Sequence, residues 1–308
     1  GHPSSRLAGV TYDDIAAIFL TPLAEPIDEP DVTTTPARRL RDALEPIATQ
    51  GWWSRPAGER LTALEIDFFP GYVWGRAAAL GTPPSSLVAA TFGVFDAALI
   101  GAVFEDGSAT VSRDDILTAR AAGAAQSIDA VAGPEECAAV ADPLLDALAH
   151  LDPLGRPLFS ALRDLPVPAS PSGRLWRAAE LVREHRGDGH LAALVSAGLD
   201  APEANVLTER WLGFGFGEYS ATRGFGPDAL AAAAARLEAK GWMAGNDLTD
   251  AGRRARADIE ASTDASQIGL VTALGSALDS VVAGADAISQ RLVEARSFPA
   301  DPRKRAAG

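Results

Sequence analysis

Residues 227–253 read PDALAAAAARLEAKGWMAGNDLTDAGR, and this stretch predicts three local structures in succession. A proline followed by an alanine-rich run is typical of a helix, which Gly241 closes. The turn Gly245-Asn246-Asp247 predicts two short strands around it, a β-wing. Thr249 or Asp250 then caps the start of a further helix. The stretch therefore predicts a helix, a wing and a helix.

The rest of the chain is also predicted to be helical. Alanine and leucine dominate the 47% of apolar residues, and long β-branched runs with alternating hydrophobicity are absent. Three prolines between Pro166 and Pro171 form the best candidate linker. We therefore expect a mainly α protein with an extended arm over residues 1–35. An N-terminal helical half over 36–165 and a C-terminal, winged-helix-like half over 172–300 should follow.

Charge and composition limit the partners. The formal net charge of −14 argues against nucleic acid as the main partner, because nucleic-acid affinity depends on basic side chains. The single Cys137 excludes intramolecular disulfides. We find no signal peptide and no apolar run of the roughly 18 residues that a membrane span needs, which predicts a cytoplasmic protein without membrane contact. The amphipathic segment from Leu270 to Arg296 would pack on this chain or on a second copy, giving a homodimer.

Two resemblances follow from these residues. The stretch 227–253 resembles the recognition helix, wing and following helix of MarR-like winged-helix proteins. Most of the chain is similar to an actinobacterial family of helix-turn-helix-like proteins of unknown function, in three segments: residues 71–81, 183–190 and 248–252. This wider resemblance implies a fold and no established activity.

The would-be recognition helix is poorly equipped to read DNA. Recognition helices need side chains that reach base edges and phosphates, and the run Ala231 to Ala235 offers none. Arg236 and Lys240 are opposed by two acids on the same helix. We therefore expect a winged-helix fold without DNA readout, and keep a MarR-like transcriptional regulator as an alternative.

An internal echo relates the two halves. Residues 75–80, Gly-Arg-Ala-Ala-Ala-Leu, resemble residues 189–194, Gly-His-Leu-Ala-Ala-Leu. If the echo is a duplication, the chain is a fused pseudo-dimer in which Arg76 and His190 hold related positions. Otherwise the chain consists of two unrelated helical halves.

The stretch from Glu184 to His190 carries the densest chemistry in the chain. It holds Glu184, His185, Arg186, Asp188 and His190, and its two glycines are expected to bend the helix. His185 or His190 beside Asp188 could act as an acid–base pair, although no catalytic residue can be assigned. Arg186 could bind a carboxylate or phosphate. As a metal site the stretch is incomplete. The alternative is a purely structural role, in which an Arg-Asp-His network ties two helices together.

Aromatic side chains accompany two further arginines. Tyr72 and Trp74 flank Arg76, and Arg223 follows a glycine-spaced aromatic segment. These rings could stack on a flat ligand or simply pack in the core.

The leading hypothesis is a winged-helix-derived protein that senses or sequesters a small molecule in a pocket between its halves. The sequence does not indicate which cofactor, if any, the protein uses. The predicted ligand-binding residues are Tyr72, Trp74, Arg76, Glu184, His185, Arg186, Asp188, His190 and Arg223. An enzyme that uses His185 or His190 with Asp188 is the second alternative.

Overall fold

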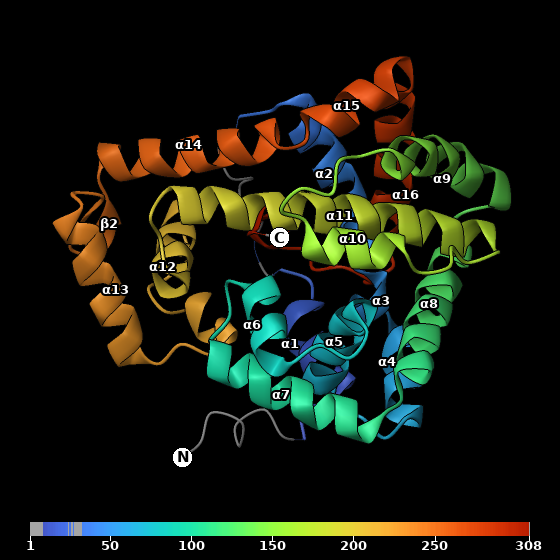
Figure 1. Cartoon of the computed structure of the whole chain (residues 1–308), viewed down its shortest axis with the longest axis horizontal. Coiled ribbons are helices and arrows are strands. Elements are labelled where there is room, and N and C mark those ends of the chain that lie inside the picture. The colour runs from blue at the N-terminus through green and yellow to red at the C-terminus, as the bar shows by residue number, and fades with distance from the viewer. Residues whose placement is uncertain (1–8, 24, 26, 28–32, 308) are drawn as a thin grey trace.

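A computed structural model describes residues 9–307 apart from 24, 26 and 28–32 (Figure 1). Helices dominate this part of the chain, and its two strands form one antiparallel pair, so the prediction of a mainly α fold is confirmed. The α-helices are α1 (Tyr12–Phe19), α2 (Pro36–Ala48), α3 (Gln50–Trp53), α4 (Arg55–Ala63), α5 (Phe68–Ala77), α6 (Ser85–Phe92), α7 (Ala97–Thr110), α8 (Arg113–Asp129), α9 (Pro134–Ala149), α10 (Pro157–Arg163), α11 (Pro171–Ser196), α12 (Ala201–Trp211), α13 (Pro227–Ala239), α14 (Asp250–Ala265), α15 (Ile268–Leu274), α16 (Leu278–Glu294) and α17 (Pro302–Ala307). The remaining elements are the 3-10 turns η2 (Ala78–Leu80), η3 (Ser220–Arg223) and η4 (Gly275–Ala277), and the strands β1 (Met243–Ala244) and β2 (Asp247–Leu248).

Helix α11 runs through the middle of the molecule, with other helices around it (Figure 1). Ser170 caps its start by accepting a hydrogen bond from the backbone N–H of Gly173 at 3.1 Å, and Pro171 occupies the first turn. Helices α2, α8, α9, α10 and α14 all pack against it. Polar residues of α11 are therefore buried, and they need partners on the neighbouring helices.

The predicted bend at Gly187 and Gly189 is wrong, because α11 continues through both. Each glycine lowers helix propensity by roughly 1 kcal/mol, and packing on several sides outweighs that cost. Gly189 permits a close approach instead: a Cβ there would lie 2.3 Å from the hydroxyl oxygen of Ser266. Its lack of a side chain thus brings the end of α14 against α11.

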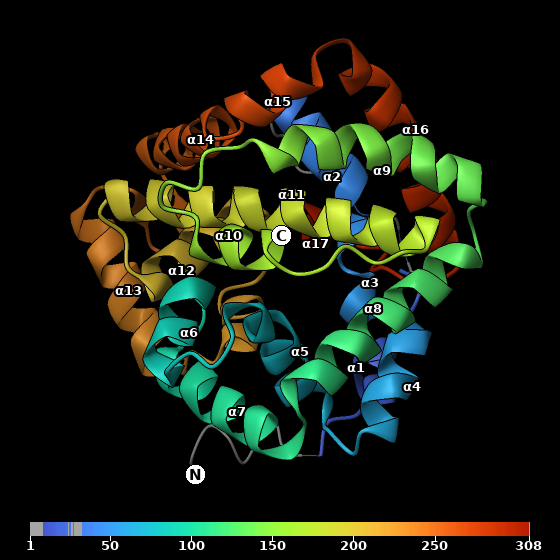
Figure 2. The same cartoon turned by 45° about the vertical axis from the view of Figure 1, so that its right-hand side comes forward.

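The largest apolar cluster joins both sides of the proline-rich connection at residues 166–171. It contains Leu44 of α2, Phe159 of α10, Trp176 of α11 and Leu292 of α16, all essentially buried. Figure 2 shows α2, α9 and α16 gathered above α11. Helix α16 contacts both α2 and α9, and each of those two helices contacts α11. The two halves of the sequence therefore share one core.

The predicted helix, wing and helix at residues 227–253 are confirmed as α13, β1–β2 and α14. The strands pair Met243 with Leu248 and Ala244 with Asp247. Thr249 caps α14 by accepting from the N–H of Gly252 at 3.1 Å. Together with α12 and the end of α11, these elements enclose their own apolar cluster.

The same order of helices occurs earlier in the chain. Helices α5, α6, α7 and α8, the N-terminal unit, follow one another as α11, α12, α13 and α14 do in the C-terminal unit. The N-terminal unit encloses a second apolar cluster. Among the described residues, strands separate the third and fourth helices only in the C-terminal unit. This parallel is compatible with a duplication, which stays a prediction.

The arm predicted for residues 1–35 is not extended throughout, because residues 12–19 form α1. Thr11 and Asp14 close a capping box at its start, and Tyr12 packs beside Trp52 and Phe68. These contacts supply the burial that a short helix needs. The arm residues 1–8, 24, 26 and 28–32 lie outside the described part of the chain.

The expectation that no apolar run could span a membrane is wrong by the criteria of length and composition. The segment Ile268–Glu294, which comprises α15, η4 and α16, meets both. On one face it contributes Leu270, Val281, Ile288 and Leu292 to the central core. A core helix also meets these criteria, so they are weak support for a span.

Candidate functional site

A cavity of about 140 Å³ lies between the N-terminal unit and the C-terminal unit. Helices α5 and α6 line one side, and α11, α12 and α14 line the other. Asn205 of α12 donates a hydrogen bond to the carbonyl of Val94 at 2.7 Å, which ties the two sides together. The charged lining residues are Arg41, Glu45, Arg76, Arg183, Glu184, Arg186, Asp188, Arg223, Arg256 and Glu260.

The cavity is basic inside a strongly acidic protein. Six arginines and four carboxylates line it, which leaves a formal excess of two positive charges. The whole chain carries a net charge of −14. Two acids outside the lining, Asp42 and Asp264, pair with Arg41 at 2.6 Å and with Arg186 at 3.0 Å.

Arg76 and Glu184 form a buried ion pair in the wall. Two guanidinium nitrogens of Arg76, Nε and Nη2, donate to the carboxylate of Glu184 at 3.1 and 2.8 Å, and Nη1 donates to the hydroxyl of Tyr72 at 2.9 Å. Burial alone would raise the pKa of Glu184, but the guanidiniums of Arg76 and Arg183 hold it below its ordinary value. The arginine predicted at this site is therefore fully engaged within the protein.

Glu260 of α14 collects a second group of arginines. Its carboxylate accepts from Arg38 at 2.9 Å, Arg186 at 3.0 Å and Arg256 at 2.6 Å. Burial opposes the charge, yet these guanidiniums lower the pKa of Glu260. Arg186 also donates to Asp264 at 3.0 Å. This group joins α2, α11 and α14 through charge-assisted hydrogen bonds.

His190 lines the cavity as a neutral imidazole. Burial, with the nearby guanidinium of Arg256, lowers the pKa of His190 to about 3. Its Nδ1 lies 2.9 Å from the hydroxyl of Thr263, which donates its only proton to the carbonyl of Ile259 at 2.8 Å. Nδ1 must therefore donate, which leaves Nε2 as an acceptor with no hydrogen bond to the described residues.

Arg223 differs from the arginines above. It donates from Nη1 to Thr222 at 3.0 Å and from Nη2 to the hydroxyl of Tyr219 at 2.7 Å, and its buried Nε has no partner. The guanidinium stacks on the rings of Phe95 and Tyr219, 4.9 and 4.4 Å from their centroids. Within the described part of the chain it makes no ion pair. Arg223 thus presents an uncompensated charge to the cavity.

A second cavity, of about 290 Å³, adjoins the first. Nine aromatic side chains line it: Phe19, Trp52, Trp53, Phe68, Phe69, Tyr72, Phe95, Tyr219 and Phe298. The two cavities share six lining residues, Glu45, Tyr72, Phe95, Arg183, Tyr219 and Arg223. One cavity is therefore rich in charge and its neighbour is rich in apolar rings.

Most of the predicted ligand-binding residues come together along the first cavity. Those that line it are Tyr72, Arg76, Glu184, Arg186, Asp188, His190 and Arg223. Trp74 lies elsewhere, in the core of the N-terminal unit, where its indole donates to the carbonyl of Val111 at 2.9 Å. His185 also lies outside the lining.

The two histidines predicted as acid–base candidates do not converge. His185 bonds to Gln267 at 2.8 Å and packs edge-on against Phe159, and burial lowers its pKa to about 4. Asp188 accepts from the backbone N–H of Phe159 at 2.9 Å, and burial raises its pKa to about 6. Neither imidazole makes a hydrogen bond with Asp188 in the described structure, so the paired arrangement that the enzyme hypothesis needs does not form.

Residues on α2 and α14 also line the cavity but are not obvious from the sequence. They are Arg41, Glu45, Arg256 and Glu260. The signal for α2 lies in Arg41 and Glu45, charged positions next to the apolar face of a helix. Arg256 and Glu260 are four residues apart, a spacing that also occurs in ordinary surface ion pairs. Their role depends on where α14 packs, which local sequence does not specify.

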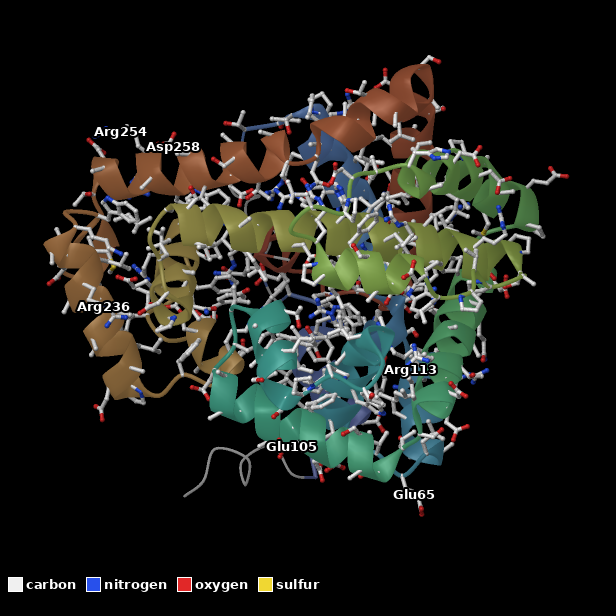
Figure 3. All side chains as sticks on the ribbon, viewed as in Figure 1. Glu65, Glu105, Arg113, Arg236, Arg254 and Asp258 are labelled. Atoms are coloured by element: carbon white, nitrogen blue, oxygen red, sulfur yellow. The ribbon has the colours of Figure 1, made fainter. Side chains whose placement is uncertain are left out.

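The outer surface of the C-terminal unit is mixed in charge. Figure 3 shows Arg254 and Asp258 on the exposed side of α14 and Arg236 on α13. Arg236 pairs with Asp200 at 2.6 Å, and Lys240 pairs with Glu203 at 2.9 Å. The basic side chains of α13 therefore serve contacts within the protein.

In the described residues, no group of three or more His, Cys, Asp or Glu side chains is placed to hold a metal ion. The chain is therefore a helical protein that has a helix–wing–helix unit and an arginine-lined cavity. A family model described as a helix-turn-helix family matches residues 37–299, and the chain belongs to this family. No curated protein and no solved structure matches the chain. The narrower resemblance to MarR-like proteins stays a prediction.

Proposed function

We propose that this helix-turn-helix-family protein binds a small anionic molecule between its two helical units, and thereby senses or sequesters that molecule. The observation that carries the proposal is Arg223, a guanidinium that stacks on two rings, lines both cavities and makes no ion pair within the described chain. An anion would supply the charge that this arginine lacks.

Thermal unfolding in the presence of a library of metabolites and small organic acids tests the proposal. A ligand that binds only the native state raises its stability, by about 2.7 kcal/mol at a concentration 100 times its Kd. We expect at least one anionic compound to raise Tm. A library without any stabilising anion would contradict the proposal.

The variant Arg223→Gln locates the binding site. Glutamine keeps hydrogen-bonding capacity and leaves no carboxylate without its partner, since Arg223 has none among the described residues. Arg254→Gln is the matched control, because Arg254 is exposed on the outer face of α14 (Figure 3). The anion-induced rise in Tm should disappear in Arg223→Gln and persist in Arg254→Gln; equal shifts in both would place binding elsewhere.

A DNA-binding regulator is a second candidate, favoured by the family and by the exposed position of α13. Against it, Arg236 and Lys240 are engaged with acids, and the rest of the exposed face of α13 is rich in alanine. An electrophoretic shift assay at low salt distinguishes the two, because nonspecific phosphate binding is strongest there. We expect no shift; a shift that salt abolishes would establish the regulator.

A further inference from the structure

The two cavities share a wall that contains both ion-paired and unpaired charges. Arg183 and Glu45 pair across it at 3.1 Å, so their charges compensate each other. Arg223 belongs to the same wall and makes no ion pair within the described residues. The wall therefore combines a satisfied pair with a free positive charge.

Lys304 of α17 adds a second free positive charge on the larger cavity. Its ammonium lies 5.0 Å from the centroid of Phe19 and 4.9 Å from that of Phe214, and it makes no ion pair in the described part of the chain. Burial, followed by the charge of Arg223, lowers the pKa of Lys304. The charges of Asp301 and Glu218 oppose this effect, but neither acid forms an ion pair with Lys304 in the described residues. An anion placed beside Lys304 and Arg223 would therefore relieve the repulsion between the two cations.

The larger cavity offers ring surfaces to the rest of such a ligand. Trp52 and Trp53 line it, with Phe68, Phe69 and Phe298. Its volume is about 290 Å³. An apolar cavity of about 150 Å³ holds one benzene molecule. The larger cavity therefore has room for two or three fused rings, and aromatic walls favour aromatic guests through edge-to-face and offset contacts.

We propose that the ligand is an acidic polycyclic aromatic compound, with two or three fused rings among Trp52 and Trp53 and its acidic group beside Arg223 and Lys304. This inference rests on the proposed function and adds the class of ligand. The smaller cavity then receives any polar substituent on the far side of Arg223, where the Nε2 of His190 can accept a hydrogen bond from a hydroxyl or amide.

Calorimetric titration of the full chain with four probes tests each part of the inference. 2-Naphthoate carries both features, 2-naphthamide lacks the charge, benzoate lacks the second ring, and decanoate replaces the rings with a chain. We expect 2-naphthoate to bind at least about tenfold more tightly than each of the others, because one charge-assisted hydrogen bond or several buried carbons contribute about 1.5 kcal/mol or more.

Variants of the protein test separately the binding of the acidic group and the binding of the rings. Arg223→Gln should weaken 2-naphthoate about tenfold and leave 2-naphthamide unchanged, whereas Arg254→Gln should change neither. Trp53→Ala should weaken both naphthyl compounds, since Trp53 is half-buried and lines only the larger cavity. Quenching of tryptophan fluorescence by 2-naphthoate in the wild-type chain provides a readout that does not depend on this variant.

The outcomes distinguish this inference from the proposed function. If other anions stabilise the protein through Arg223 while 2-naphthoate binds no better than benzoate or decanoate, the ligand class is wrong and the function stands. If 2-naphthamide binds as tightly as 2-naphthoate, the acidic group is wrong. If neither the probes nor the anion library binds, the proposed function itself fails.

Discussion

Two groups of cations line the same pair of cavities, and they are arranged differently. Arg76 meets the buried carboxylate of Glu184, and Arg186 meets the partly buried carboxylate of Glu260. Arg223 and Lys304 rest on aromatic rings and have no carboxylate partner among the described residues. Carboxylates of the protein neutralise the arginines of the first group, whereas the charges of the second group remain available to a ligand. We infer that the ion-paired arginines, the paired side, hold the cavity walls in place. Arg223 and Lys304, the unpaired side, would then bind the ligand.

Removal of Arg76 should have the largest effect on stability. Arg76→Ala leaves Glu184, whose side chain is 5% exposed, without its two-point partner. Breaking a buried ion pair from one side costs about 3–5 kcal/mol. Because Arg183 still lies 3.1 Å from Glu184, chemical denaturation should show a loss near the lower end of this range. Arg223→Gln, on the unpaired side, should lose less than about 1 kcal/mol. Equal losses in the two variants would contradict the division.

Gly187 and Gly189 of α11 test how tightly the ion-paired side of the cavity is held. Gly189→Ala places a Cβ 2.3 Å from the hydroxyl oxygen of Ser266, and such overpacking should cost about 1–3 kcal/mol. At Gly187 the nearest atom would be 3.7 Å away, on Glu184. Gly187→Ala should therefore stabilise the helix by up to about 1 kcal/mol. Thermal and urea unfolding of both variants would measure this; stabilisation by Gly189→Ala would show that α14 does not press on α11.

The pH dependence of stability should report His190. Its pKa is lowered to about 3 in the folded protein, so the folded state resists protonation. Its contribution is complete above the unfolded pKa of about 6.5 and is lost as the pH falls below that value. We expect a loss of about 1–2 kcal/mol from this residue between about pH 7 and about pH 5.

The variant His190→Asn isolates this contribution, since its amide can still donate to Thr263. His185, with a pKa lowered to about 4, acts in the same direction, whereas Asp188, with a pKa raised to about 6, gains stability as the pH falls. The difference between wild type and His190→Asn should therefore shrink toward acidic pH. A constant difference would mean that His190 is not held neutral.

An exposed pair provides the smallest expected effect. Arg236 lies 2.6 Å from Asp200, but both side chains are about half exposed. Its second acid, the buried Glu203 at 3.4 Å, keeps Lys240 as a partner at 2.9 Å when Arg236 is removed. Surface pairs contribute about 0–1 kcal/mol, so Arg236→Ala should change the unfolding free energy by less than about 0.5 kcal/mol. Anion binding should not change at all. An effect as large as that of Arg76→Ala would remove the distinction between buried and exposed pairs.

Local sequence signals were sufficient for much of the fold. Pro227, Gly241 and Thr249 mark the ends of α13 and the start of α14 through short-range rules for capping and turns. The bend predicted from Gly187 and Gly189 was wrong, because the effect of these glycines depends on neighbours that are distant in sequence. The hydroxyl of Ser266, which explains Gly189, is brought there only by the packing of α14.

The candidate site was predictable where chemistry clusters in the sequence. Glu184, Arg186 and His190 share one helix, and Arg76 and Arg223 could be found by their aromatic neighbours. Glu260 could not, because its three guanidinium partners come from α2, α11 and α14 itself. Lys304 could not either, since a basic residue near a chain end gives no sign that it lies against Phe19.

A crystal structure of the protein with its most stabilising anion tests the central claim most directly. We expect an acidic group about 2.7–2.9 Å from a nitrogen of Arg223, with the rest of the ligand in the aromatic cavity and the Arg76–Glu184 pair intact. A ligand bound away from Arg223, or one that displaces Glu184 from Arg76, would contradict it.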